Sequence, residues 1–145
     1  MARPILSADE AKMSARRALV AFSGEADLKW LRLLKPGYRH CFVLLESVGA
    51  WVVYNPLSNG TEVDIWPPEH EDVVRAWLAQ HGYEVTATTV NPLQPKPLMW
   101  APYSCVEAVK RVLGVRASGV FTPWQLYRHL KNQNKSINSL TCADQ

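Results

Sequence analysis

The chain has 145 residues, of which 48% are hydrophobic and 20% charged, and its formal net charge is +3. This length fits a single domain with its own core, and this composition excludes a wholly disordered chain. The longest apolar run is too short to cross a bilayer, and no signal peptide is recognisable. We therefore expect a cytoplasmic protein with no membrane partner.

The N-terminal half predicts two helices followed by a β-hairpin. A capping box at Ser7 and Glu10 opens a helix over residues 8–22, and a shorter helix follows near residues 26–34. The runs 40–46 and 50–55 are rich in β-branched and aromatic residues, and the short link between them predicts a hairpin turn.

The C-terminal half alternates between strands and helices. Residues 61–66 predict a third strand, 69–81 a helix, 83–90 a fourth strand and 115–121 a short strand. Thr122 is the expected N-cap of a last helix. We therefore predict an α+β domain over residues 1–135, with a four-stranded, mainly antiparallel sheet packed with helices, and a polar tail at 136–145.

Three cysteines, an odd number, argue against a disulfide framework. Cys41 is expected in the core and Cys142 in the polar tail. Because the sequence has neither the spacing of a zinc site nor a glycine-rich phosphate loop, we predict no metal site and no cofactor.

Cys105 has a more informative position. Ser104 and Glu107 form a capping box, and Gly114 marks the end of the same helix. Cys105 therefore falls in the first helical turn, where unpaired backbone N–H groups and the helix dipole favour a thiolate, the nucleophilic form of cysteine.

The hairpin supplies two residues that complement this thiol. If Ser47 pairs with Ala50, His40 and Asn55 become diagonal neighbours on one face of the sheet. A cysteine nucleophile, a histidine base and an amide that orients the histidine are the components of thiol catalysis. The same register places three apolar residues on the face of His40: Phe42, Trp51 and Val53.

A His on one strand, a Trp and an Asn-Pro pair on the next, and a Cys opening a helix resemble the papain-like superfamily of cysteine hydrolases, which includes NlpC-like cell-wall enzymes. Because His40 and Asn55 precede Cys105, the order is similar to that of the circularly permuted branch. The resemblance covers roughly residues 38–56 and 104–113. It implies a permuted papain-like fold, with Cys105 as nucleophile, His40 as general base and Asn55 as the residue that orients the imidazole.

Two functional hypotheses follow. The first is a hydrolase of the thiol protease or amidase type, or an acyltransferase, acting on a peptide or amide substrate, with pocket walls from Trp51, Trp100 and Tyr103. The second is a catalytically silent papain-like fold that serves as a structural or binding component of a larger assembly with protein partners, such as a phage particle. A basic stretch from Cys105 to Lys135 also leaves nucleic acid as a weaker candidate partner.

Overall fold

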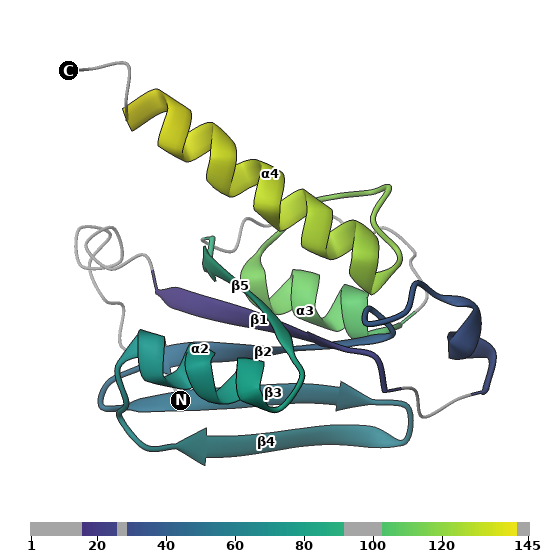
Figure 1. Ribbon diagram of the computed structural model, residues 1–145, viewed down its shortest axis with the longest axis horizontal. Coiled ribbons are helices and arrows are strands. Elements are labelled where there is room, and N and C mark those ends of the chain that lie inside the picture. The colour runs from purple at the N-terminus through teal and green to yellow at the C-terminus, as the bar shows by residue number, and fades with distance from the viewer. Residues whose placement is uncertain (1–15, 26–28, 92–102, 142–145) are drawn as a thin grey trace, which may run out of the picture.

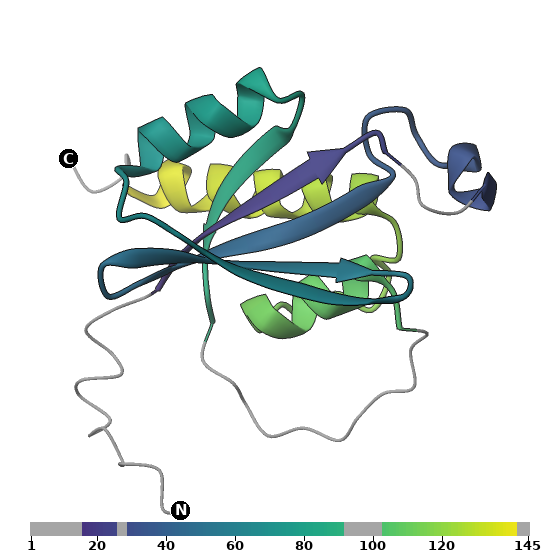
Figure 2. The same ribbon diagram turned by 90° about the horizontal axis from the view of Figure 1, so that it is seen from below.

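The structure, a computed structural model, describes residues 16–25, 29–91 and 103–141. These residues form an α+β fold with a five-stranded, open antiparallel sheet in the order β4-β3-β2-β1-β5. The helix α2 covers one face of the sheet, while α3 and α4 cover the other (Figure 1, Figure 2). The elements are β1 (Arg17–Ser23), η1 (Lys29–Leu33), β2 (His40–Ser47), β3 (Ala50–Leu57), β4 (Gly60–Trp66), α2 (Glu71–Gln80), β5 (Glu84–Thr89), α3 (Cys105–Leu113) and α4 (Pro123–Thr141).

The prediction of four strands was wrong because β1 lies within the segment predicted as a helix at 8–22. Side chains 18–22 are each at most 1% exposed, since β1 lies between β2 and β5 and both of its faces are covered. A strand buried on both faces is a continuous apolar run, which periodicity does not distinguish from a buried helix. Residues 8–15 of that predicted helix lie outside the described residues.

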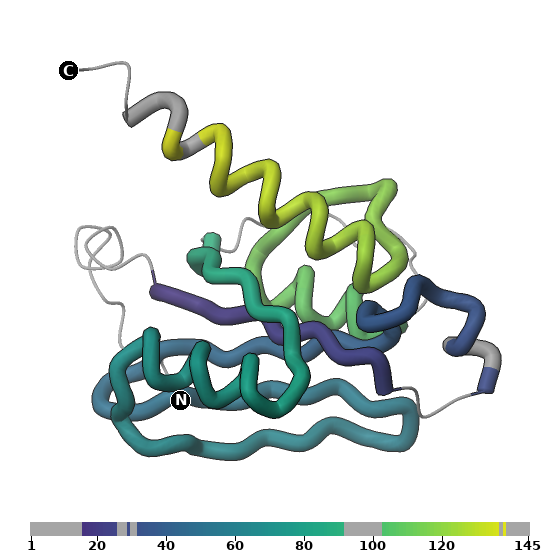
Figure 3. The backbone as a smooth tube through the Cα atoms, in the orientation of Figure 1, coloured from purple at the N-terminus to yellow at the C-terminus, as the bar shows by residue number. Residues whose placement is uncertain are grey.

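The predicted hairpin is confirmed, including its register, in which Ser47 lies opposite Ala50. The predicted third strand is β4, which pairs with β3 at one edge of the sheet. The predicted fourth strand is β5, but it pairs with β1 at the opposite edge. Figure 3 traces how α2 carries the chain between the two edges.

Two hydrophobic cores lie on the two faces of the sheet. The core on the α3 side joins alternate residues of β1 and β2 to the apolar faces of α3 and α4: Ala18, Val20, Phe22, Cys41, Val43, Val106, Val109, Leu113, Val115, Leu126 and Leu130. The core on the α2 side uses the intervening residues: Leu19, Ala21, Phe42, Leu44, Trp51, Val53, Val74, Leu78 and Val85. The period-two alternation of the central strands therefore builds both cores at once.

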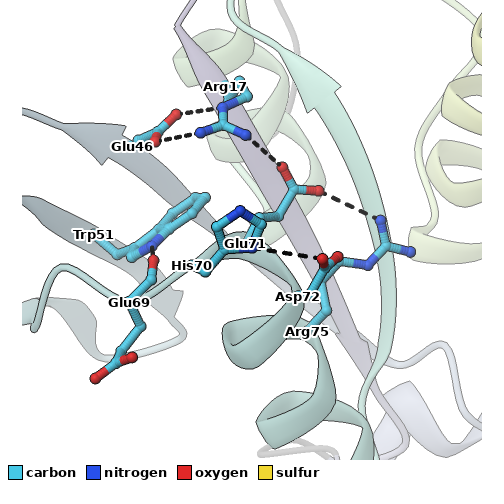
Figure 4. Close-up of polar contacts among 8 residues, drawn as sticks. All are labelled: Arg17, Glu46, Trp51, Glu69, His70, Glu71, Asp72 and Arg75. Carbon is cyan, nitrogen blue, oxygen red and sulfur yellow. Dashed lines mark hydrogen bonds and ion pairs between the residues drawn. The ribbon is translucent and has the colours of Figure 1, made fainter.

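Polar contacts hold the start of α2 against the sheet (Figure 4). The indole Nε1 of Trp51 donates to the carbonyl oxygen of Glu69, at 2.9 Å. The guanidinium of Arg17 bonds the carboxylates of both Glu46 and Glu71, so it links β1, β2 and α2. These contacts give the polar groups at the start of α2 hydrogen-bond partners from the sheet.

The remaining predictions for local structure are confirmed in part. Thr122 caps α4 as expected, because its Oγ1 accepts from the backbone N–H of Gln125 at 3.3 Å. The predicted helix at 26–34 is a short 3₁₀ helix over Lys29–Leu33, and residues 115–121 form a loop rather than a strand. The helix α4 continues to Thr141, so residues 136–141 of the expected tail are helical. None of the described helices has the length and apolar character needed to cross a bilayer.

The end of α3 generates a stability prediction. Gly114 has φ +63°, and a Cβ there would lie 2.7 Å from the carbonyl oxygen of Asn91. We expect Gly114→Ala to lower the free energy of unfolding by about 2 kcal/mol or more, because left-handed strain adds to the clash. Gly82, at φ +83° with open space around it, separates the two effects. Gly82→Ala should cost only about 1 kcal/mol in urea unfolding, and equal losses for the two variants would contradict the clash.

Candidate active site

The first turn of α3 places Cys105 as the sequence predicted. Ser104 is the N-cap, and its hydroxyl accepts from the backbone N–H of Glu107 at 3.2 Å. Cys105 is the first residue of α3; it is half-buried and packs against the core on the α3 side. Its own N–H belongs to the first turn, whose amides have no acceptor within the helix.

His40 and Asn55 meet as the hairpin register predicted. The imidazole Nε2 of His40 donates to Oδ1 of Asn55, at 2.7 Å. The amide Nδ2 of Asn55 in turn donates to Oε2 of Glu62, at 3.0 Å. Because a carboxylate only accepts, Glu62 fixes which end of the amide faces the imidazole. The amide oxygen then requires the proton on Nε2, which leaves Nδ1 of His40 as the nitrogen for Cys105.

The Cys105 sulfur interacts with His40. Strand alternation does not predict this interaction, because His40 and Phe42 share a face of β2, and Phe42 lies in the core on the α2 side, whereas α3 packs on the other side. The explanation lies at the end of the hairpin. The pairing of β2 with β3 runs from Ser47 and Ala50 to Val43 and Tyr54. Beyond it, β2 continues along β1 and β3 continues along β4. We infer that the imidazole reaches both Asn55 and Cys105 at this open end of the pair.

The environment of Cys105 favours its thiolate. Its pKa is lowered to about 5, chiefly by the hydrogen bond that the Cys41 thiol donates to the Cys105 sulfur. Burial acts in the opposite direction, while the hydrogen bond and positive charge of His40 and the backbone N–H of Cys41 lower the pKa further. Cys105 is therefore predominantly a thiolate at neutral pH, with His40 beside it.

Two residues that sequence reasoning missed complete the site. Cys41, expected only as a core residue, is fully buried and also bonds the Cys105 sulfur. Glu62, which bonds Asn55, lies directly opposite it in the pairing of β3 with β4. The two-residue turn at Ser58 and Asn59 was the signal for this pairing, since it sets the register of the second hairpin.

The three residues predicted as pocket walls are Trp51, Trp100 and Tyr103, and their outcomes differ. Trp51 does not line the site, because it is 2% exposed in the core on the α2 side. Trp100 lies outside the described residues. Tyr103 is 63% exposed, and its hydroxyl lies 3.4 Å from that of Tyr54 on β3.

An exposed apolar strip continues from these tyrosines across the sheet. Tyr54 pairs with Val63, and residues that pair directly share a face. Val63 and Ile65, two positions apart on the edge strand β4, are 64% and 70% exposed on that face. We call Tyr54, Val63, Ile65 and Tyr103 the apolar strip. It lies on the α3 side of the sheet and begins beside the first turn of α3.

The basic stretch after Cys105 is partly neutralised within α3. Lys110 is only 7% exposed and bonds Glu107 at 3.1 Å, while Arg111 bonds the same carboxylate at 3.0 Å. These bonds outweigh the effect of burial and hold the pKa of Glu107 below its usual value. Two of the six cations in this stretch are therefore paired within α3 itself.

Comparison with known proteins gives no match: no family model, curated protein or solved structure is similar to this chain at a significant level. Among the residues that the structure describes, no group of three or more His, Cys, Asp or Glu side chains gathers in a way that would hold a metal ion.

The lowered pKa of Cys105 predicts its reactivity. The rate of iodoacetamide alkylation at Cys105 should rise through a midpoint near pH 5 and level off above it, whereas an ordinary thiol has its midpoint near about pH 8.5. His40→Ala removes a hydrogen bond and a positive charge, so the midpoint should move upward and the rate at about pH 6 should fall about tenfold or more. Peptide mapping by mass spectrometry separates Cys105 from Cys142, the internal reference. A wild-type midpoint near that of Cys142 would contradict the lowered pKa of Cys105.

Glu62 generates a second prediction about this site. Glu62→Ala removes the acceptor that orients Asn55, so alkylation of Cys105 at about pH 6 should slow by about three- to tenfold, the equivalent of one hydrogen bond. Asp64→Ala removes a similar charge from the same strand without touching Asn55 and should change the rate by less than about twofold. Glu62→Gln retains an oxygen acceptor and should restore most of the rate. Equal effects of the two alanine variants would show that only the charge matters.

Proposed function

We propose that this chain is a cysteine-dependent amide hydrolase or acyltransferase in which Cys105 is the nucleophile, His40 the general base and acid, and Asn55 the residue that orients the imidazole. The observation that supports this proposal is the linked set of contacts from the Cys105 sulfur through His40 and Asn55 to Glu62. Four elements, α3, β2, β3 and β4, supply these groups, and each group acts on the next in a way that suits thiol catalysis.

The reaction begins with the thiolate of Cys105 attacking the carbonyl carbon of the substrate. The carbonyl π electrons move to the oxygen, and the N–H of Cys105 at the start of α3 is placed to stabilise the oxyanion. Collapse of this intermediate breaks the C–N bond, and the leaving amine takes the proton from Nδ1 of His40. A thioester remains on Cys105.

The thioester is resolved by a second nucleophile. Water, in hydrolysis, or an amine, in acyl transfer, gives its proton to Nδ1 of His40 as it attacks the thioester carbonyl. The thiolate of Cys105 then leaves, which restores the nucleophile. Throughout, the bond from Nε2 of His40 to Asn55 holds the ring in the orientation that both proton transfers need.

The apolar strip indicates which part of the substrate lies beside the thiolate. Val63, Ile65 and Tyr103 are exposed, Tyr54 is partly buried, and none of the four side chains carries a charge. We therefore propose that the strip accepts an apolar portion of the substrate, such as a hydrophobic side chain of a peptide.

The α2 side supports a second candidate function, as a component of a larger assembly. A hollow of about 430 Å³ there is lined by Trp66, Pro67, Glu69, Val73, Val74 and Trp77. Trp77 is 44% exposed and Val73 is 52% exposed, and exposed apolar patches are typical of interaction sites. This function would not require the thiol, so Cys105→Ser, which ends catalysis, should leave assembly intact.

Catalysis is tested most directly through the acyl-enzyme. Wild-type protein mixed with p-nitrophenyl acetate should release a burst of p-nitrophenolate equal to one acetyl group per chain, carried on Cys105. Cys105→Ala and His40→Ala should each reduce the burst rate by about a thousandfold, and Asn55→Ala by a smaller factor, because orientation is only part of the role of the base. Cys142→Ser is the matched control and should retain the full burst.

A panel of peptides, including cell-wall peptides and isopeptides, then identifies the amide that is cleaved. A burst that persists in Cys105→Ala, or an ordinary burst with no amide cleaved or transferred across the panel, would overturn the proposed function.

A further inference from the structure

The structure places a second thiol in the core against which the proposed nucleophile packs. Cys41 lies on β2 in the core on the α3 side, where it is 0% exposed, and Cys105 packs against this same core from the first turn of α3. Each thiol also acts on the pKa of the other through a side-chain hydrogen bond, so the two cysteines are neighbours within this core. Cys105 is the more exposed of the two.

The proposed amide chemistry needs only the thiol of Cys105. A buried apolar side chain of similar size would fill the position of Cys41 equally well. The second sulfur therefore calls for its own explanation. Its position, beneath a nucleophilic thiolate and shielded from solvent, is that of a thiol that responds to a change at Cys105.

We propose that Cys105 and Cys41 form a peroxide-reactive pair, in which Cys105 is oxidised by a small hydroperoxide and Cys41 resolves the product as a reversible intramolecular disulfide. The proposal shares with the proposed function only the thiolate of Cys105 and does not depend on amide chemistry. The disulfide would occupy the nucleophile and switch catalysis off.

In the first step, the Cys105 thiolate attacks one oxygen of the hydroperoxide. An S–O bond forms and the O–O bond breaks, which gives a sulfenic acid on Cys105. The leaving oxygen takes the proton of the His40 imidazolium and departs as water or an alcohol. A compact hydroperoxide matches the partial exposure of Cys105, since only one oxygen has to reach the sulfur.

In the second step, Cys41 attacks the Cys105 sulfur as the S–S bond forms and the S–O bond breaks. The hydroxyl group leaves with the Cys41 proton as water, so two thiols and one hydrogen peroxide give one disulfide and two waters. Burial raises the pKa of Cys41, and so does the neighbouring Cys105 thiolate. Because the sulfenic acid is uncharged, the first step removes that second cause and makes Cys41 a better nucleophile at the moment it is needed.

The test uses the full chain carrying Cys142→Ser, so that only Cys41 and Cys105 remain of the three cysteines. After hydrogen peroxide at about neutral pH, both thiols should become unreactive towards Ellman's reagent in denaturant, and a non-reducing peptide map should show Cys41 linked to Cys105. Dithiothreitol should restore both thiols and the rate of Cys105 alkylation almost completely. Recovery of Cys41 as a free thiol beside a sulfinic or sulfonic acid at Cys105 would overturn the proposal.

Cys41→Ser is the diagnostic variant, because it retains a small side chain that donates a hydrogen bond. Its Cys105 should pass to sulfinic and sulfonic acid, and dithiothreitol should no longer restore alkylation. Cys41→Ala serves the same purpose if the serine is not tolerated in the core, and circular dichroism confirms the fold of either variant. Reversible oxidation in the absence of Cys41 would also contradict the proposal.

The two proposals fail separately. If the disulfide forms but Cys105 is never acylated, the redox proposal stands and the hydrolase proposal fails. If Cys105 is acylated but no disulfide forms, the hydrolase proposal stands and the redox proposal fails.

Discussion

The contact between the first turn of α3 and the first residues of β2 is the interaction on which the proposed chemistry depends. It brings a thiol from one segment against an imidazole and a second thiol from another, about sixty-five positions earlier in the sequence. Burial alone would favour a neutral Cys105. Two donated hydrogen bonds from Cys41 and the charged ring of His40 outweigh burial, so the thiolate is the stable form.

The sheet makes this contact possible by separating its strands at one end. His40 and Asn55 lie beyond the last paired residues of β2 and β3, where each strand pairs only with its outer neighbour. A hairpin paired along its whole length would keep His40 on the α2 side and Cys41 on the α3 side. At the open end, both residues reach the same sulfur. The positioning of the imidazole is thus a property of the sheet rather than of α3.

The two faces of the sheet have different tasks. The α3 side carries the thiolate and the apolar strip, and Glu107 neutralises two of the nearby cations. The α2 side is closed by Trp51 and the bonds of Arg17, which leaves its exposed apolar residues near Trp77 as a separate surface. Because the surfaces do not overlap, catalysis and assembly are compatible with one another in the same fold.

The sequence by itself determined the features that depend on neighbouring residues. The cap at Ser104, the left-handed Gly114 and the register of the hairpin are local, so they predicted the position of Cys105 and the pairing of His40 with Asn55. Only the tertiary structure decided that β1 is a central strand, because an apolar run buried on both faces has no distinguishing period. Only the tertiary structure shows that Trp51 lies away from the site and that Cys41 lies beside Cys105, since both outcomes depend on which helix covers which face of the sheet.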